Sequence, residues 1–243
     1  MSGNHTFLLQ DVINDLINTN VSVEAALFRL QYFARLVKNE ELLKYTESEI
    51  NGYKDAELPA YRKGLAKITA NMQVGYNHHT GEIPVIMLEA PYNELLQYHG
   101  VHEGIKVLEQ MSARPVSEES QTLRVDFPME WLHILQPAAV KIYKANMKLH
   151  VVGAVITSNA NIIIQIVSTV RARLLAFSME LAEQFGYDID IRPFKQEGMI
   201  NNQTINYLIK TEINNNGDGN VINSGDDPKI IAAIDIKKTN NEL

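Results

Sequence analysis

The sequence predicts an α+β fold, and three observations support this class. Apolar residues recur at helical spacing before residue 52, alternate after residue 62, and return to helical spacing in one long stretch from Ile162 to Gln184. We therefore expect an N-terminal layer of three helices, a central β-hairpin or small sheet with helices, and a long spine helix. A small Asn-rich β appendage is expected after the spine helix.

Size and composition exclude several kinds of protein. With 243 residues the chain can bury a core of its own, and with no cysteine it has no disulfide framework, thiolate metal site or cysteine nucleophile. A net charge of −7 argues against a surface given over to nucleic acid, whose phosphates require Lys and Arg. The amino terminus lacks the features of a signal peptide, and no uninterrupted apolar run reaches about 18 residues. Composition therefore predicts a cytoplasmic protein without a membrane span.

Three helices with short connections are predicted within the first 52 residues. Apolar positions from Leu9 to Ile17 give the first helix, and Ser22 and Asn39 stand where the N-caps of the second and third are expected. Gly52 stands where the third helix should end in a left-handed residue. Helices joined in this way are expected to pack as an antiparallel layer.

A β-hairpin is predicted over residues 65 to 88, with its turn at Tyr76 to Gly81 and its second strand at Ile83 to Leu88. Pro91 is expected to open a short helix through Tyr98. After an interruption by a glycine, Val101 to Met111 should resume as a helix with one apolar face.

The next segments mix strand and helix signals. Leu123 to Phe127 alternate like a strand, and Pro128 is expected to start a helix that ends at Leu135. The apolar stretch from Val140 to Ile156 fits either structure; its second half, from Leu149, is rich in β-branched residues and is interpreted as a strand that ends at a turn over Ser158 to Asn161.

The predicted domain boundary lies at residue 190, where an Asn-rich tail of residues 191 to 243 follows the main domain of residues 1 to 190. One interpretation is a flexible, low-complexity tail. We favour a small β-rich element for oligomerisation or partner binding, because hydrophobic residues recur between turn signals. These β-like pieces are Ile205, Tyr207 and Ile209; Val221 and Ile222; and Ile230 to Ile236.

Three groups of acidic and histidine residues have spacings that suggest metal sites: His78, His79 and Glu82; His99, His102 and Glu103; and Glu130 with His133. The first group lies on the predicted turn, where polar side chains are expected in any case. The second departs from the residue order of zinc-binding helices. The third is half of a di-iron motif without its second half. We therefore predict no metal and no cofactor.

No catalytic residue can be assigned from local motifs. The sequence has no G-x-S-x-G elbow, Walker loop or G-x-G-x-x-G after a strand. An active site can also be built from dispersed residues, so an enzyme stays an alternative. Four arginines on two predicted helices form a candidate surface for an anion or ligand: Arg29, Arg35, Arg171 and Arg173. The competing interpretation is that they pair with neighbouring acidic residues in solvent.

The segment ESEINGYKDAELPAYR, residues 47 to 62, joins the helical and the alternating parts of the chain. We interpret it as a structural corner, in which Tyr53 and Tyr61 hold the helices to the next strand and Arg62 pairs with a carboxylate or a helix C-terminus. Its signature residues are Glu49, Asn51, Gly52, Tyr53, Leu58, Pro59, Tyr61 and Arg62.

These motifs resemble those of the AbiTii domain family of bacterial abortive-infection proteins. The resemblance is carried by DVINDL (Asp11 to Leu16), VEAALFRLQYFARLV (Val23 to Val37), ELLKYTESEINGY (Glu41 to Tyr53), ELPAYR (Glu57 to Arg62), GIKVLEQM (Gly104 to Met111) and TVRARLLAFSMELAEQ (Thr169 to Gln184). It covers residues 6 to 186 and implies a role in defence against bacteriophage. It supplies no catalytic residues, and the tail is similar to the variable extension of such proteins.

Three hypotheses follow. The first is a non-enzymatic anti-phage protein that acts through protein contacts and self-assembly, with a second copy, another defence protein or a phage protein as its partner. The second is an effector enzyme that acts on nucleic acid or a nucleotide. The third is a sensor that binds a phage product or a nucleotide through the arginine surface.

Overall fold

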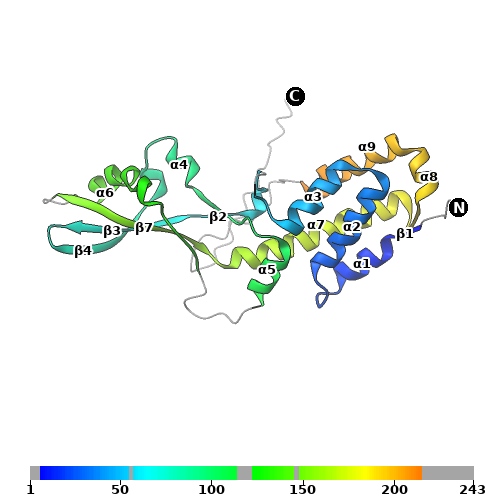
Figure 1. Cartoon of the computed structure of the whole chain (residues 1–243), viewed down its shortest axis with the longest axis horizontal. Helices are drawn as coiled ribbons and strands as arrows, with labels where there is room; N and C mark the ends of the chain where they lie inside the picture. Colours follow the sequence, from blue (N-terminus) through cyan, green and yellow to red (C-terminus); the bar gives the residue numbers. More distant parts are fainter. Residues whose placement is uncertain (1–5, 55–56, 114–121, 145–147, 215–243) are drawn as a thin grey trace, which may run out of the picture. The chain divides into compact units, whose positions relative to one another are not determined.

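The computed structural model describes residues 6–54, 57–113, 122–144 and 148–214 (Figure 1). These residues mix helices and strands, which confirms the predicted α+β class. The chain divides into two compact units. Unit 1 contains Met1–Tyr61, His102–Ala113 and Ile164–Leu243, and unit 2 contains Arg62–Val101 and Arg114–Ile163.

The first three helices of unit 1 confirm the predicted layer. They are α1 (Leu9–Ile17), α2 (Val23–Val37) and α3 (Glu40–Asn51). The Ser22 side chain accepts a hydrogen bond from the backbone N–H of Glu24, and the Asn39 side chain accepts one from Leu42, so both predicted N-caps are present. The helices pack α1 on α2 and α2 on α3.

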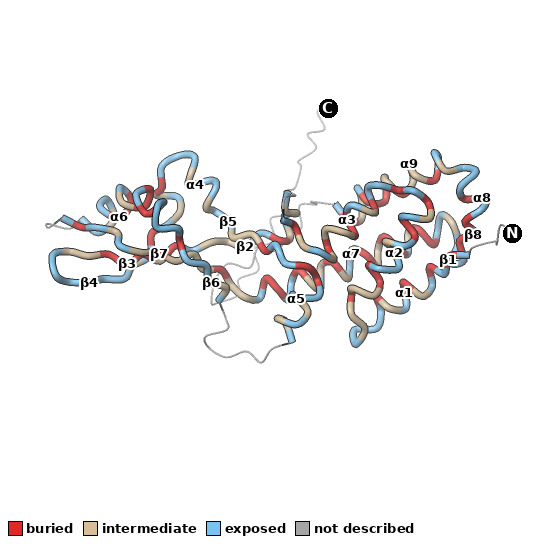
Figure 2. The backbone as a smooth tube through the Cα atoms, in the orientation of Figure 1, coloured by how far each residue is buried: buried red, intermediate tan, exposed pale blue. Residues whose placement is uncertain are grey.

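The long helix α7 spans Asn161–Phe185. Its first three residues belong to unit 2, and the rest of the helix contributes to the core of unit 1. Its stripe at steps of three and four residues is fully buried, as the red segments of the tube show (Figure 2): Ile166, Val170, Leu174, Phe177 and Leu181. By length and composition alone, with a mean hydropathy of 1.5, α7 could cross a membrane. Its stripe is buried in unit 1, but only 39% of its apolar window is buried, and a single helix of this kind is weak evidence for a membrane span.

Unit 1 also contains the pair of short strands β1 (Thr6–Leu8) and β8 (Asp188–Asp190), and the helix α5 (Ile105–Ser112). After β8 come α8 (Ile191–Gln196) and α9 (Gly198–Leu208), and a π-helical turn, η5 (Ile209–Ile213).

The predicted β pieces at Ile205, Tyr207 and Ile209 are therefore wrong, because this segment is helical. Its buried positions, Ile205, Leu208, Ile209 and Ile213, repeat at helical spacing and place one apolar face in the core. The other predicted β pieces, Val221 and Ile222 and the stretch from Ile230 to Ile236, lie outside the described residues.

Unit 2 is built on a four-stranded antiparallel sheet in the order β4-β3-β7-β6. Its strands are β3 (Lys67–Val74), β4 (Asn77–Ile83), β6 (Thr122–Asp126) and β7 (Leu149–Asn159). One face carries Ile68, Ala70 and Met72 into a core shared with the 3-10 helix η4 (Met129–Ile134) and with α6 (Gln136–Tyr143). Between β4 and β6 lie the 3-10 helix η2 (Val85–Met87), α4 (Tyr92–Leu95) and β5 (Tyr98–Gly100), which pairs with β2 (Lys63–Leu65).

The predicted hairpin exists, but its turn and second strand are displaced. Val74 pairs with Asn77, so the turn consists of Gly75 and Tyr76, and most of the predicted turn lies in β4. Gly75 has φ +61°, a conformation that glycine adopts at little cost, and this permits a two-residue connection. The stretch expected as the second strand contains the end of β4 and η2 instead.

The helices around the predicted hairpin are also shorter than expected. Helix α4 covers only Tyr92–Leu95, because Tyr98 is paired in β5. Helix α5 begins at Ile105, with Gly104 as its N-cap, and not at Val101. The residues after Pro128 form a 3-10 helix, followed by α6. The strand predicted from Leu149 is confirmed and runs on to Asn159.

Candidate functional site

A buried carboxylate with three tyrosines forms the densest polar group of unit 1. Glu49, in the last turn of α3, is completely buried. Its Oε1 atom accepts hydrogen bonds from the hydroxyls of Tyr53, at 2.7 Å, and Tyr61, at 2.5 Å. Tyr45 lies one turn before Glu49 on α3, and its hydroxyl is buried. We call Tyr45, Glu49, Tyr53 and Tyr61 the tyrosine cluster.

Two arrangements bring the tyrosines to Glu49. Gly52 ends α3 with φ +88°, and the chain turns so that Tyr53 reaches back to the preceding helical turn. Tyr61 arrives from the far end of the connecting segment, and Arg173 of α7 lies over its ring, with the guanidinium carbon 4.6 Å from the ring centroid. The same guanidinium donates a hydrogen bond to the carbonyl of Ile213, 2.5 Å away.

Burial keeps the cluster's hydroxyls protonated. It raises the pKa of Tyr45 and of Tyr53 well above the ordinary tyrosine range, and the nearby Glu49 carboxylate raises both further. Burial also raises the pKa of Tyr61, with Tyr45 and then Glu49 adding to the shift. As neutral groups, the hydroxyls of Tyr53 and Tyr61 donate hydrogen bonds to Glu49, and none of the three hydroxyls is suited to act as a base.

The end of α3 contacts the chain that leads into α5. Tyr53 N donates to the carbonyl of His102 at 2.8 Å, and His102 Nδ1 lies 2.6 Å from the carbonyl oxygen of Tyr53. A Cβ atom on Gly52 would stand 2.5 Å from that His102 carbonyl, so this close approach requires glycine. His102 therefore has a structural position beside the tyrosine cluster.

The remaining signature residues differ in burial. Arg62, in unit 2, is completely buried, and its partners include the carbonyl of Val101, to which Nη1 donates at 3.1 Å. Leu58 and Pro59 are half-buried, and Asn51 is exposed. The segment thus places a carboxylate, two tyrosines and an arginine in the interior, which agrees with a structural interpretation.

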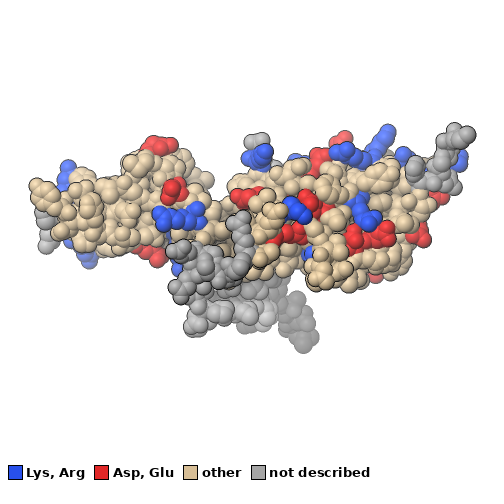
Figure 3. All heavy atoms as spheres, turned by 60° about the horizontal axis from the view of Figure 1, so that its bottom comes forward, with Lys and Arg blue, Asp and Glu red and all other residues tan. Residues whose placement is uncertain are grey.

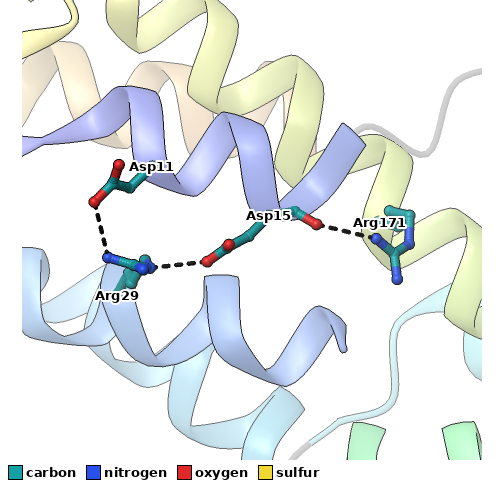
Figure 4. A network of polar contacts seen from close by, with 4 residues as sticks. All are labelled: Asp11, Asp15, Arg29 and Arg171. Carbon is teal, nitrogen blue, oxygen red and sulfur yellow. Dashed lines mark hydrogen bonds and ion pairs between the residues drawn. The ribbon is translucent and has the colours of Figure 1, made fainter. Parts of the chain in front are cut away.

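The four predicted surface arginines each bind acceptors of the chain itself. Arg29 pairs with Asp15 at 2.8 Å and with Asp11 at 3.2 Å, as Figure 4 shows. Arg35 pairs with Glu47 at 3.3 Å. Arg171 donates to four backbone carbonyls in and after α1: those of Asp15, Leu16, Asn18 and Val21.

The four arginines come from two helices: Arg29 and Arg35 from α2, and Arg171 and Arg173 from α7. Arg29 and Arg35 keep exposed side chains, at 46% and 63%, whereas Arg171 and Arg173 hold backbone segments together. On the face drawn in Figure 3, acidic side chains are interspersed with the basic ones. Arg29 and Arg35 fit the competing interpretation, because they pair with the acidic residues Asp11, Asp15 and Glu47.

The histidine groups occupy ordinary structural or solvent positions. His78 and His79 are exposed on β4, and His133 Nδ1 lies 2.8 Å from the backbone carbonyl of Glu130. His99, in β5, has Nδ1 2.9 Å from the hydroxyl of Ser158. Within the described ranges, no three His, Asp or Glu residues are placed to hold a metal ion.

A second candidate site is an open groove of about 380 Å³ on unit 1. The sequence did not predict this groove. It is lined by β1, by Asp11 of α1, and by Phe28, Arg29 and Tyr32 of α2. Phe28 and Tyr32 are 50% and 53% exposed, one helical turn apart. Phe28 and Tyr32 do not belong to the buried apolar stripe of α2, and this position in the helical pattern is the sequence signal for their exposure.

Together, these features define a two-unit α+β protein with a buried tyrosine cluster and an apolar groove on its helical unit. The AbiTii family model matches residues 7–207, and the chain therefore belongs to the AbiTii family. Membership implies a role in abortive infection, a bacterial defence against phage. The match extends past the predicted limit at residue 186 and takes in α8 and most of α9. Neither the curated proteins nor the solved structures contain a match.

Proposed function

We propose that this AbiTii-family protein defends the cell against phage without catalysis, in the cytoplasm, through protein contacts and self-assembly. The proposal rests on which side chains are buried and which are exposed. Glu49, Tyr53, Tyr61 and Arg62 of the family-like signature make hydrogen bonds inside the fold. The large apolar side chains of Phe28 and Tyr32 on α2 are instead exposed to solvent beside a groove. Exposed apolar patches of this kind are typical of protein interaction sites.

The tyrosine cluster supports a structural role for the signature. A general acid or base must lie within hydrogen-bond reach of a substrate and have a pKa near the working pH. Glu49 is completely buried and already accepts two hydrogen bonds, and the pKa values of its tyrosine partners lie far above neutral pH. The cluster therefore suits stabilisation of the α3 end better than proton transfer.

The groove supports a contact role. Phe28 and Tyr32 offer rigid rings, and Leu8 of β1, which is 49% exposed, adds an aliphatic side chain beside them. Arg29 and Asp11 place one charge of each sign at the same groove. Aromatic residues with a neighbouring arginine are enriched at the energetic centres of protein interfaces.

Self-assembly is assigned to the residues after Asn214. A shortened chain should end at Asn214 and not at residue 190, because α8 and α9 bury Ile191, Phe194, Ile205 and Leu208 in unit 1. Light scattering should give the full chain a mass that is a multiple of 27.4 kDa and the shortened chain a mass near that of one copy. A full chain that stays monomeric at all concentrations would refute self-assembly.

The enzyme alternative is tested separately. Purified protein is incubated with RNA, DNA and nucleotides, with and without a divalent metal ion. No turnover is expected. Turnover that disappears in a variant of a described surface residue, while the fold persists, would replace the proposal with the effector-enzyme hypothesis.

A further inference from the structure

We propose that the groove beside β1 binds the segment Ile230–Ile236 of a second copy of the chain, which joins the outer edge of β1 as an additional strand. This inference rests on the proposed self-assembly and names the surfaces that meet. One surface is described in the structure, and the other is a sequence that lies beyond Asn214.

The outer edge of β1 offers unpaired backbone groups. Phe7 is opposite Ile189 of β8, and Leu9 N donates to the carbonyl of Tyr187 at 2.9 Å. Because hydrogen-bonded residues alternate along an antiparallel pair, the N–H and C=O of Thr6 and the N–H of Leu8 point away from β8. No other described strand pairs with β1. Such an edge can accept a strand from another chain.

The groove lies on the side of β1 where a new strand would be added. It is lined by residues of β1, α1 and α2, and by none of β8. Phe28 and Tyr32 follow one another along α2 beside β1, and Leu8 is exposed next to them. A strand on this edge would therefore find main-chain partners on β1 and apolar side chains on α2.

The segment from Ile230 to Ile236 has the pattern that this groove requires. Side chains of a strand alternate between its two faces, so Ile230, Ala232, Ile234 and Ile236 would share one face if the segment bound as a strand. That face is entirely apolar and fits Leu8, Phe28 and Tyr32. Asp235 would lie on the opposite face of such a strand, away from the apolar side chains of the groove.

An exchange between copies joins each chain's segment to its partner's groove. A contact of this kind between identical chains closes a dimer when it is reciprocal. The same segment bound to its own groove would leave the protein monomeric, and this outcome separates the two arrangements experimentally.

A photo-cross-linker tests the contact in the full chain. We replace Ile234 with p-benzoylphenylalanine, mix isotopically labelled and unlabelled protein, irradiate, and identify the joined peptides by mass spectrometry. We expect labelled-to-unlabelled cross-links from position 234 to peptides of β1, α1 and α2. Cross-links confined to one copy, or to other elements, would overturn the proposal.

Groove variants supply the matched comparison. Phe28→Ser and Tyr32→Ser should each lower the yield of the inter-copy cross-link at least tenfold, with an unchanged far-UV circular dichroism spectrum. Tyr76→Ser, at a fully exposed tyrosine of unit 2, should leave the yield unchanged. Equal yields in all three variants would overturn the assignment to the groove.

The cross-linking result and the light-scattering mass test different parts of the proposal. A multimeric full chain whose cross-links avoid the groove would contradict this inference and leave the proposed self-assembly intact. A monomeric full chain would contradict both.

Discussion

The hydroxyl of Tyr61 donates a hydrogen bond to Oε1 of Glu49 across 2.5 Å, in a place where the Glu49 carboxylate has no contact with solvent. The bond joins the last turn of α3 to the end of the segment that leaves it. A buried carboxylate is costly unless hydrogen bonds compensate for the lost water, and Tyr53 supplies a second one. We therefore expect Glu49, Tyr53 and Tyr61 of the signature to stabilise the fold.

Removing this carboxylate should destabilise the protein strongly. Glu49→Ala leaves the hydroxyls of Tyr53 and Tyr61 without their buried acceptor, and we expect a loss of about 3 kcal/mol in the free energy of unfolding, measured with urea. Glu47→Ala, two residues away, removes only the exposed pair with Arg35 and should cost less than about 1 kcal/mol. Equal losses in the two variants would contradict the role given to Glu49.

Pro59→Ala and Tyr61→Ala test whether the signature acts through stability. Both should lower the melting temperature, and Tyr61→Ala should have the larger effect because it removes both the hydrogen bond to Glu49 and the ring that Arg173 contacts. Phage protection should fall in the same order as the melting temperature. A variant that keeps full stability and loses protection would indicate a functional surface at this segment.

Alkaline pH should destabilise the protein through the tyrosine cluster. The pKa values of Tyr45, Tyr53 and Tyr61 are raised in the folded state, so their contribution is complete below the unfolded tyrosine pKa of about 10 and declines as pH rises above it. In that range the unfolded chain loses protons that the folded chain retains. Each tyrosine should then cost about 1.4 kcal/mol of stability per pH unit.

Tyr45→Phe separates the cluster from the other tyrosines. It removes one of the three raised groups, so unfolding free energies measured between pH 10 and 11.5 should fall less steeply than in the natural protein. Tyr76→Phe changes a fully exposed tyrosine and should leave the slope unchanged. Identical slopes in all three proteins would show that the cluster is not the origin of the alkaline loss.

The start of α2 should depend on a residue that is distant in sequence. Glu109 of α5 accepts a hydrogen bond from Val23 N at 2.7 Å and another from the Ser22 hydroxyl. Its carboxylate thereby caps the positive end of the α2 dipole. Glu109→Ala should lose about 1.5 kcal/mol in thermal or urea unfolding. Gln110→Ala, at an exposed position of the same helix, is the control and should change little.

Substitution of Arg171 tests whether this arginine stabilises the fold or binds a ligand. Its guanidinium donates to four carbonyls between Asp15 and Val21, a geometry that an ammonium group cannot reproduce. Arg171→Lys should therefore lower stability by about 2 kcal/mol, whereas Arg35→Lys, at an exposed ion pair, should be neutral within the error of a urea titration. If Arg171→Lys unfolds like the natural protein and loses protection against phage, the sensor hypothesis gains its first support.

The helical part of the fold was predictable because its signals are local. Ser22 and Asn39 cap the helices they were expected to cap, and the stripe of α7 is buried at the predicted positions. The sequence did not reveal the helical nature of residues 191 to 213, because Asn and Thr between isoleucines also fit strands. In residues 191 to 213, burial of one apolar face in unit 1 favours helix over strand.

The candidate sites were predictable to different degrees. The corner segment was recognisable from its glycine, proline and tyrosines, whereas the common acceptor at Glu49 required the three-dimensional path of the chain. The four arginines stood out by charge, yet their partners are backbone carbonyls and acidic side chains of other segments. Phe28 and Tyr32 lie off the apolar stripe of α2, which indicates exposure, but the sequence does not show that β1 stands beside them to form a groove.

Protection against phage is proposed to depend on contacts at the surface of unit 1. The most direct measurement is the efficiency of phage plating on cells that carry the natural protein, Phe28→Ser or Tyr32→Ser, with Tyr76→Ser as control and with each variant at equal cellular level. We predict that the natural protein and the control reduce plating and that the two groove variants do not. Full protection by the groove variants would contradict a role for these surface contacts.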